Sequence, residues 1–437
     1  MSNRSLNIPA DILPSDDVLS QCIHCGMCLA VCPTYDLTKN ERSSPRGRIK
    51  MIKSVSQGEL PISDLFAEEM NFCLDCQACE TACPAGVKYG KLVESARVVV
   101  DEKYKNTFFK IQVKRFLLRK ILADKSNLKL FAKFLRFYQH SFLKNFFENS
   151  GILKIFSKNL PEISKLSPKI SDFFSDEKIP EISRPEADAK YKTAFHYGCI
   201  MNVAFADINI DTIDVLKEFG CEVFTPQNQV CCGSLHAHNG DIEFARTIAK
   251  KNIDSFVQSE YEYLISNSAG CGAFMKEYGD LFKDDPDYSE KAKIFSNRVR
   301  DVSEFLCDKR SASGPGNFNA TITYHDACHL AHSQKITKEP RELLKSIQGL
   351  ELVEMEYSDT CCGSAGIYNV TRFEDALYFL KNKIGDIKWT GASIVVTGNP
   401  GCITQLVYGA KRFNCEVEIK HPVTLLKNII ADPDSHK

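Results

Sequence analysis

The sequence of 437 residues contains no uninterrupted apolar run close to the roughly 18 residues that a membrane-spanning helix needs. Its first residues, Met-Ser-Asn-Arg-Ser-Leu-Asn-Ile-Pro, include no apolar core of a secretory signal. These two absences predict a chain that stays in the cytoplasm, where thiols remain reduced. In that compartment the 19 cysteines are expected to bind metal and not to form disulfides.

The chain also lacks an excess of either charge, because its formal net charge is −1. This balance predicts no general attraction to nucleic acid. No Gly-x-Gly-x-x-Gly follows the predicted strands, so the sequence has no flavin or nicotinamide fingerprint of its own. The length and the 43% hydrophobic content allow two to four ordinary domains.

The first 83 residues contain two complete copies of the bacterial ferredoxin run, C-x2-C-x2-C-x3-C-P. In that run three thiolates wrap one cubane, and the fourth cysteine, which precedes proline, reaches across to the other cluster. The spacing predicts one [4Fe–4S] cluster held by Cys22, Cys25, Cys28 and Cys83. It predicts a second held by Cys73, Cys76, Cys79 and Cys32. Zinc is the alternative, but zinc ribbons favour paired Cys-x2-Cys hooks over a triplet with a crossing ligand.

The segment between the two runs carries Ser44-Pro45-Arg46-Gly47-Arg48-Ile49. Guanidinium groups stay charged and present several donors, so Arg46 and Arg48 could bond cluster sulfides or a partner carboxylate. A solvated basic turn that caps a helix is the alternative, and the sequence leaves both interpretations open.

The middle of the chain is basic and aromatic, with 14 Lys or Arg and 2 Asp or Glu between Lys103 and Lys158. Apolar residues recur at helical spacing, as in Phe109, Val113, Phe116, Leu117 and Ile121. Such helices either pack on the ferredoxin module with their lysines in water or bind an anionic membrane surface or a partner. Residues 160–190 contain four prolines and little periodicity, which is typical of a linker.

A second cysteine pattern occurs twice in the last 240 residues: a single cysteine, then Cys-Cys-Gly, then a cysteine behind glycine. The first copy comprises Cys199, Cys231, Cys232 and Cys271, and the second comprises Cys328, Cys361, Cys362 and Cys402. The intervals agree to within one residue, which indicates an internal duplication. Cys221, Cys307 and Cys415 fall outside the pattern and are expected to pack as small apolar groups.

Each copy alternates strand-like runs, such as 263–266 and 392–397, with helical ones, such as 211–219 and 374–384. This alternation predicts an α/β unit with a mainly parallel sheet, whose sites collect at the carboxyl ends of the strands. Adjacent cysteines suit a polynuclear cluster, so we expect one iron–sulfur centre per repeat or one shared centre. A structural metal or a thiol–disulfide relay is the alternative. His196 and His325 occupy equivalent places and could ligate or tune the site, or be hydrogen-bonded core residues.

In these cysteine motifs the chain resembles the iron–sulfur subunits of glycolate oxidase (glycolate dehydrogenase). It also resembles the broader CCG-domain family, which includes lactate-utilisation proteins and subunits of heterodisulfide reductase and of anaerobic glycerol-3-phosphate dehydrogenase. The motifs that carry the resemblance are Cys25-Gly-Met-Cys28, residues 44–49, residues 268–279 and Cys361-Cys-Gly-Ser-Ala-Gly-Ile-Tyr368.

The resemblance implies an electron-transfer subunit of a flavin-dependent 2-hydroxy-acid dehydrogenase, membrane-associated on the cytoplasmic face. FAD would lie in a partner subunit and quinone would be the acceptor. The alternatives are a reductase that acts at its own CCG site, as in heterodisulfide reductases, or a subunit of a glycerol-3-phosphate or other dehydrogenase. Heterodisulfide reductases carry a fifth cysteine per repeat, where this chain has Phe274 and Gln405. Four thiolates per repeat fit a conventional cubane better.

The sequence therefore predicts a multidomain α+β protein. A helical two-[4Fe–4S] ferredoxin-like domain (1–102) is followed by a basic helical segment and linker (103–188). A duplicated α/β CCG domain completes the chain, with its repeats at 189–315 and 316–437.

Overall fold

The computed structural model of the chain describes residues 14–104, 109–257, 259–310 and 317–431. Residues 1–13, in which the sequence has no apolar signal core, and the expected boundary between the repeats at 315–316 lie outside these ranges.

The regular elements described in the N-terminal module, residues 14–104, are all helices, and its cysteine runs lie mainly in the turns between them. Three helices, α3 (Pro45–Ser56), α4 (Asp64–Phe72) and α6 (Tyr89–Tyr104), pack around a core that includes Ile52, Met70 and Leu92. Ser44 and Ser63 cap α3 and α4, because each hydroxyl accepts the amide hydrogen three residues on. The shorter elements are α1 (Asp16–Leu19), α2 (Pro33–Thr38), η1 (Glu41–Ser43) and α5 (Ala78–Thr81).

The basic middle segment forms a series of helices. They are α7 (Phe109–Phe116), a π-helical turn η2 (Leu117–Leu122), α8 (Lys125–His140), α9 (Phe142–Asn149), α10 (Ile152–Phe156), α11 (Leu160–Lys165) and α12 (Ser175–Lys178). Ile111 of α7 packs on the N-terminal module, but Leu128 and Ala132 of α8 pack on the segment around Phe174 and Val203. The expectation that these helices cover the ferredoxin module therefore holds only for α7. Among the described residues, no helix is long and apolar enough to cross a membrane.

The first repeat contains a five-stranded sheet of order β1-β3-β2-β4-β5. All pairings are parallel except that of β1, which comes from the segment expected to be linker. The strands are β1 (Ile182–Ser183), β2 (Tyr191–His196), β3 (Cys221–Phe224), β4 (Tyr263–Ser266) and β5 (Val299–Asp301). The helices are α13 (Ile200–Ala204), α14 (Ala206–Glu218), α15 (Ser234–Ala237), α16 (Ile242–Phe256), α17 (Ala269–Lys276), α18 (Tyr278–Leu281), α19 (Ser289–Arg298) and α20 (Val302–Lys309).

The second repeat has a fully parallel sheet of order β7-β6-β8-β9, which is the order β3-β2-β4-β5 of the first repeat. Its strands are β6 (Asn317–Tyr324), β7 (Gln348–Leu352), β8 (Ile394–Val396) and β9 (Glu418–Lys420). Its helices are η3 (His329–Ser333), α21 (Lys338–Lys345), α22 (Tyr368–Thr371), α23 (Phe373–Thr390), α24 (Pro400–Arg412) and α25 (Pro422–Ala431). The shared topology confirms the predicted duplication and the predicted fold class.

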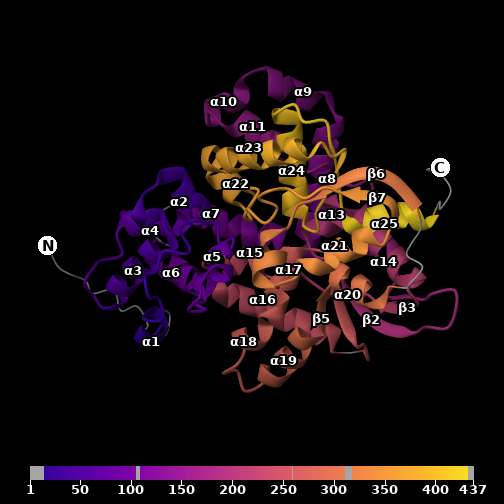
Figure 1. Cartoon of the computed structure of the whole chain (residues 1–437), viewed down its shortest axis with the longest axis horizontal. Coiled ribbons are helices and arrows are strands. Elements are labelled where there is room, and N and C mark those ends of the chain that lie inside the picture. The colour runs from indigo at the N-terminus through magenta and orange to yellow at the C-terminus, as the bar shows by residue number, and fades with distance from the viewer. Residues whose placement is uncertain (1–13, 105–108, 258, 311–316, 432–437) are drawn as a thin grey trace.

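The two repeats share one apolar core, which includes Phe195 and Ile265 of the first sheet and Tyr324 and Val396 of the second. The turns after β4 and β8 also meet, because the Ala269 amide donates to the Gly398 carbonyl at 3.1 Å. The turns at the carboxyl ends of β4 and β8 consequently lie together, and in Figure 1 the indigo N-terminal module lies on one side of the two repeats. Sites at strand ends are thereby placed in one region of the molecule.

Two helical glycines of the second repeat test this packing. A Cβ at Gly409 in α24 would lie 2.6 Å from Leu380 Cδ1 and 2.9 Å from Ile384 Cγ1 of α23, whereas nothing lies within 4 Å at Gly385. We expect Gly409→Ala to destabilise the repeat by about 1–3 kcal/mol through overpacking. Gly385→Ala should stabilise it by about 0.5–1 kcal/mol, since alanine loses less backbone entropy in a helix. Urea unfolding midpoints of the two variants should move in opposite directions, and a shift in the same direction would contradict the helix contact.

Candidate metal centres

Five cysteines line a cavity of about 420 Å³ at the outer end of the N-terminal module. Four of them are Cys22, Cys25 and Cys28 of the first loop and Cys83, the last cysteine of the second run, and Cys79 completes the set. His24 and Gly26 adopt left-handed backbone conformations (φ 54° and 89°), which let the loop wrap around a central space. Cys25 is exposed, so this cavity reaches the protein surface.

A second cavity, of about 300 Å³, is lined by Cys32, Cys73, Cys76 and Cys79, all of which are buried. Asp75 and Gln77 repeat the left-handed conformations of His24 and Gly26, with φ of 54° and 62°. Burial raises the pKa of the Cys76 and Cys79 thiols well above the usual value. Thiolates here need a bound cation or cluster to offset their desolvation, so metal binding is coupled to proton release.

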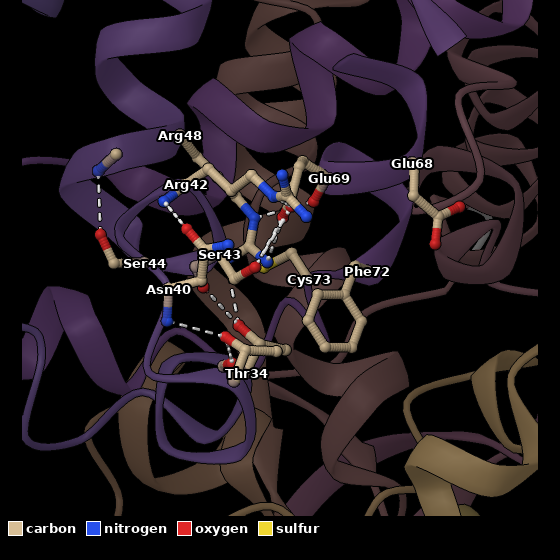
Figure 2. A network of polar contacts seen from close by, with 12 residues as sticks. Thr34, Asn40, Arg42, Ser43, Ser44, Arg48, Glu68, Glu69, Phe72 and Cys73 are labelled. Carbon is tan, nitrogen blue, oxygen red and sulfur yellow. Dashed lines mark hydrogen bonds and ion pairs between the residues drawn. The ribbon is translucent and has the colours of Figure 1, made fainter. Parts of the chain in front are cut away.

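Arg48 supports the second cavity from the insertion between the two runs. Its side chain is fully buried, its Nε donates to the Glu69 carbonyl at 2.8 Å, and its Nη1 donates to Thr34 Oγ1 at 3.1 Å. Figure 2 shows Arg42 and Ser43 converging with it on the Glu69 side chain. A solvated basic turn is therefore the wrong interpretation for Arg48.

Arg46 has a different partner set from Arg48. Its Nε donates to Glu41 at 2.7 Å and its Nη1 donates to the His24 carbonyl at 3.1 Å, within the first cysteine loop. Arg46 thus ties that loop to the η1–α3 junction, next to the first cavity.

The four cysteines of the first repeat gather at the ends of β2 and β4 and in the turn after β3; we call them the first cysteine site. Cys199 Sγ and Cys231 Sγ lie 3.5 Å apart. Hydrogen bonds from Cys199 and from Cys232 lower the pKa of Cys231 well below its usual value. His196 Nε2 lies 3.1 Å from the Val230 carbonyl oxygen, so this ring is held by backbone.

The second cysteine site contains Cys328, Cys361, Cys362 and Cys402 at the equivalent positions. The Gly363 amide donates to Cys361 Sγ at 3.4 Å, and Asn399 Nδ2 donates to Cys402 Sγ at 3.5 Å. One nitrogen of His325 and the sulfurs of Cys362 and Cys402 all lie within 4.8 Å of one another. Burial lowers the pKa of His325 to about 3, so the ring is neutral.

The second ferredoxin-type cavity adjoins the second cysteine site. Cys76 and Cys361 belong to one buried cluster, and Cys328 packs against it. Burial is the largest cause of the raised pKa of Cys76, and the charge of nearby Cys328 is the second largest. Tyr368 reinforces the junction by donating its hydroxyl to the Phe72 carbonyl at 3.2 Å.

The sequence missed the polar residues at this junction. His238 bonds Glu94 at 2.5 Å, lies 3.3 Å from Asp75 and stacks on His329 with ring centroids 5.1 Å apart. Burial alone would lower the pKa of His238, but the bonds to Asp75 and Glu94 raise it to about 10. Asp75 sits inside a cysteine loop, and no local pattern distinguishes it as an inter-domain contact. Lys383, buried near Cys361 and Cys362, could have been found by aligning the repeats.

The three remaining cysteines lie apart from these sites. Cys221 is buried in the shared core, Cys415 is buried in the second repeat, and Cys307 is buried beside Arg310 and Glu342. Their burial agrees with the expected packing role.

Comparison with known protein families matches three regions of the chain. A 4Fe-4S dicluster domain matches residues 18–87, a cysteine-rich domain matches residues 193–276 and 322–407, and the linker region of the glycolate oxidase iron-sulfur subunit matches residues 112–167. The cysteine geometry and these matches define a multidomain iron–sulfur protein.

Similar curated proteins specify the family. The chain is 34% identical over 422 residues to the probable glycolate oxidase iron-sulfur subunit of Bacillus subtilis, covering 96% of this chain and 95% of the relative. It is 30% identical to the glycolate oxidase iron-sulfur subunit of Escherichia coli, covering 91% and 92%. Lactate utilization protein A of Oceanobacillus iheyensis is 30% identical over 54% of this chain and 96% of its own length. The chain belongs to the family of glycolate oxidase iron–sulfur subunits.

The Arg48 network leads to a stability prediction. Arg48→Met removes a buried cation and leaves the buried Glu69 carboxylate with weaker compensation, which should cost about 3 kcal/mol. Arg42→Gln, the control, removes a partner of the same carboxylate whose own side chain is 53% exposed, and should cost less than about 1 kcal/mol. Hydrogen–deuterium exchange of the α3 and α4 amides in anaerobically purified protein measures both losses. Equal effects would show that burial of Arg48 is not what stabilises the module.

Proposed function

We propose that this chain is the electron-transfer subunit of a flavin-dependent 2-hydroxy-acid dehydrogenase of the glycolate or lactate type. In this proposal it accepts electrons from FAD in a partner subunit and passes them toward quinone. A [4Fe–4S] cluster accepts and returns one electron with little rearrangement. The carbon chemistry belongs to the flavin partner, which selects the substrate.

The observation that carries this proposal is the continuity of the cysteine sites. The first cavity opens at the surface at Cys25, shares Cys79 with the buried second cavity, and that cavity adjoins the second cysteine site. A row of sites from surface to interior suits electron transfer more than it suits isolated structural metals.

The proposed ligands follow from these placements. Cys22, Cys25, Cys28 and Cys83 would hold the first cluster, and Cys73, Cys76, Cys79 and Cys32 the second. Each cysteine site of the repeats would hold a further iron–sulfur centre, since four sulfur donors gather there from separate turns. Their donor chemistry suits iron–sulfur clusters.

The test is anaerobic co-purification with the flavin partner, with iron, sulfide, zinc and flavin quantified. We expect Cys362→Ser to abolish flavin-to-acceptor electron transfer while the electron paramagnetic resonance (EPR) signals of the two N-terminal clusters remain. Cys415→Ala, the matched control in the same repeat, should retain both transfer and signals, because Cys415 lies outside the cysteine sites. Zinc at each four-cysteine set, without iron, would refute the proposal.

A second candidate function is reduction of a small acceptor by this chain itself. A cavity of about 1110 Å³ lies at the junction of the modules, lined by Cys73, Asp75, Lys114, His329 and Arg372 among others. It borders both the second ferredoxin-type cavity and the residue next to Cys328, so an acceptor bound there would lie close to two proposed centres. Acceptor reduction by the chain without its partners, when chemically reduced, would favour this candidate.

We further propose that the protein binds the anionic cytoplasmic surface of a membrane through an aromatic face. We give this name to six exposed side chains of successive helices, five phenylalanines and one isoleucine, each between 52% and 81% exposed: Phe131, Phe134, Phe137, Phe142, Phe146 and Ile155. It belongs to α8, α9 and α10, and α9 and α10 form one extremity of the molecule in Figure 1. Exposed lysines, including Lys133 and Lys154, accompany it. Phenylalanines beside lysines suit the boundary of an anionic bilayer.

Vesicle co-sedimentation tests the aromatic face. The double variant Phe134→Ser/Phe137→Ser should bind vesicles rich in anionic lipid at least about tenfold more weakly, because two apolar side chains no longer enter the interface. The control Trp389→Ser removes a side chain that is 73% exposed on α23 and should bind like the unaltered protein. Unchanged vesicle binding together with loss of the flavin partner would instead assign this face to that partner.

A further inference from the structure

The two cysteine sites correspond position by position. Gly233 closely approaches the Ala245 backbone of α16, and Gly363 approaches the Ala376 backbone of α23 in the same way. Ala245 and Ala376 are therefore equivalent, and the same offset pairs Asn252 with Lys383. His196 and His325 are equivalent too, since each stands three residues before the first cysteine of its site.

In the first repeat, amide and backbone groups occupy the space around the cysteines. Asn252 Nδ2 donates to the Cys231 carbonyl at 2.9 Å, and its Oδ1 accepts from the Val230 amide at 3.0 Å. The Val230 carbonyl in turn lies 3.1 Å from His196 Nε2. The His196 ring is thereby held by the backbone just before the Cys-Cys-Gly turn.

In the second repeat this arrangement is lost, because Lys383 replaces the asparagine. Its ammonium donates to the Tyr357 carbonyl and lies 3.7 Å from Asp386. His325 is fully buried, and within the described part of the chain neither ring nitrogen meets the geometry of a hydrogen bond, although the Ser358 backbone lies close to the ring. A buried neutral imidazole without a partner costs free energy, so such a ring in a native structure calls for a water, an ion or another ligand beside it.

The unpartnered ring lies among sulfur donors. A nitrogen of His325, Cys362 Sγ and Cys402 Sγ lie within 4.8 Å of one another, whereas the equivalent first-repeat residues, which are also described, form no such group. Histidine nitrogen and cysteine sulfur are both established ligands of iron in iron–sulfur centres.

We propose that His325 is a nitrogen ligand to iron in the second cysteine site, alongside Cys328, Cys361, Cys362 and Cys402, whereas its counterpart His196 in the first site is bonded to backbone. This inference rests on the proposed function, because it requires an iron–sulfur centre in the second repeat. It makes the two duplicated sites chemically different. The Lys383 ammonium near Cys361 and Cys362 favours the reduced form of the second centre, so its potential should be the higher of the two.

Pulsed EPR of reduced protein containing ¹⁵N-labelled histidine tests the ligand. The unaltered holoprotein should show a nitrogen coupling of the strength that a directly bonded imidazole gives, larger than that of hydrogen-bonded amides. His325→Gln should remove this coupling, and His196→Gln, the matched control at the equivalent position, should retain it. The labelled unaltered protein gives a result even if a variant folds poorly.

The outcomes separate this inference from the function on which it rests. Iron at the second repeat without a strong histidine coupling would overturn the role of His325 and leave the electron-transfer proposal standing. A coupling that survives His325→Gln would also overturn it. If the iron content of the unaltered protein is accounted for by the two N-terminal clusters alone, no centre exists in the second repeat. The ligand role of His325 then fails, while electron transfer through the N-terminal clusters stands.

Discussion

Placing many cysteine sulfurs in buried sites is the constraint on which the rest of this structure depends. A thiolate loses its hydration on burial, and the raised pKa values of Cys76 and Cys79 express that loss. Bound iron compensates the charge only where several sulfurs meet, so the fold must bring distant turns together. The left-handed residues in the N-terminal loops and the strand ends of the two sheets perform this task in different ways.

Support for these sites comes mainly from charged groups that are themselves buried. Arg48 organises Glu69, Thr34 and the η1 turn beside the second cavity, and Thr34 Oγ1 lies 3.3 Å from Cys32 Sγ. His238 joins Asp75 and Glu94 across the boundary between the N-terminal module and the first repeat. Because each buried charge needs its partner, these contacts hold the modules in one relative position.

The duplication preserved the backbone and changed the chemistry. Apart from β1, the two sheets have the same strand order. The two Cys-Cys-Gly turns lie against equivalent alanines, Ala245 of α16 and Ala376 of α23. Lys383 at the position of Asn252 nevertheless adds a buried cation beside the second Cys-Cys-Gly turn. The two repeats can thus differ in the donors and charges at their cysteine sites.

Much of this could be predicted from the sequence. Cysteine spacing indicated two clusters with crossing fourth ligands, and the equal intervals after Cys199 and Cys328 indicated a duplicated parallel α/β unit. The duplication is confirmed by the shared strand order, and the crossing ligands stay a prediction that rests on which sulfurs the spacing lets reach a common centre. Three features could not be predicted, because local patterns do not say which surfaces meet. They are the burial of Arg48, the exposure of Phe134 and Phe137, and the packing of α8 on the first repeat.

The sequence by itself therefore determined the family, the fold class and the duplication of the cysteine-rich domain. Only the tertiary structure decided that the second ferredoxin-type cavity adjoins the second repeat and that His325, unlike His196, faces sulfur without a backbone partner. The physical reason is that these properties depend on contacts between residues far apart in the chain. Lys383, which lies 58 residues from His325 and near Cys361 and Cys362, is one such contact that no local motif reveals.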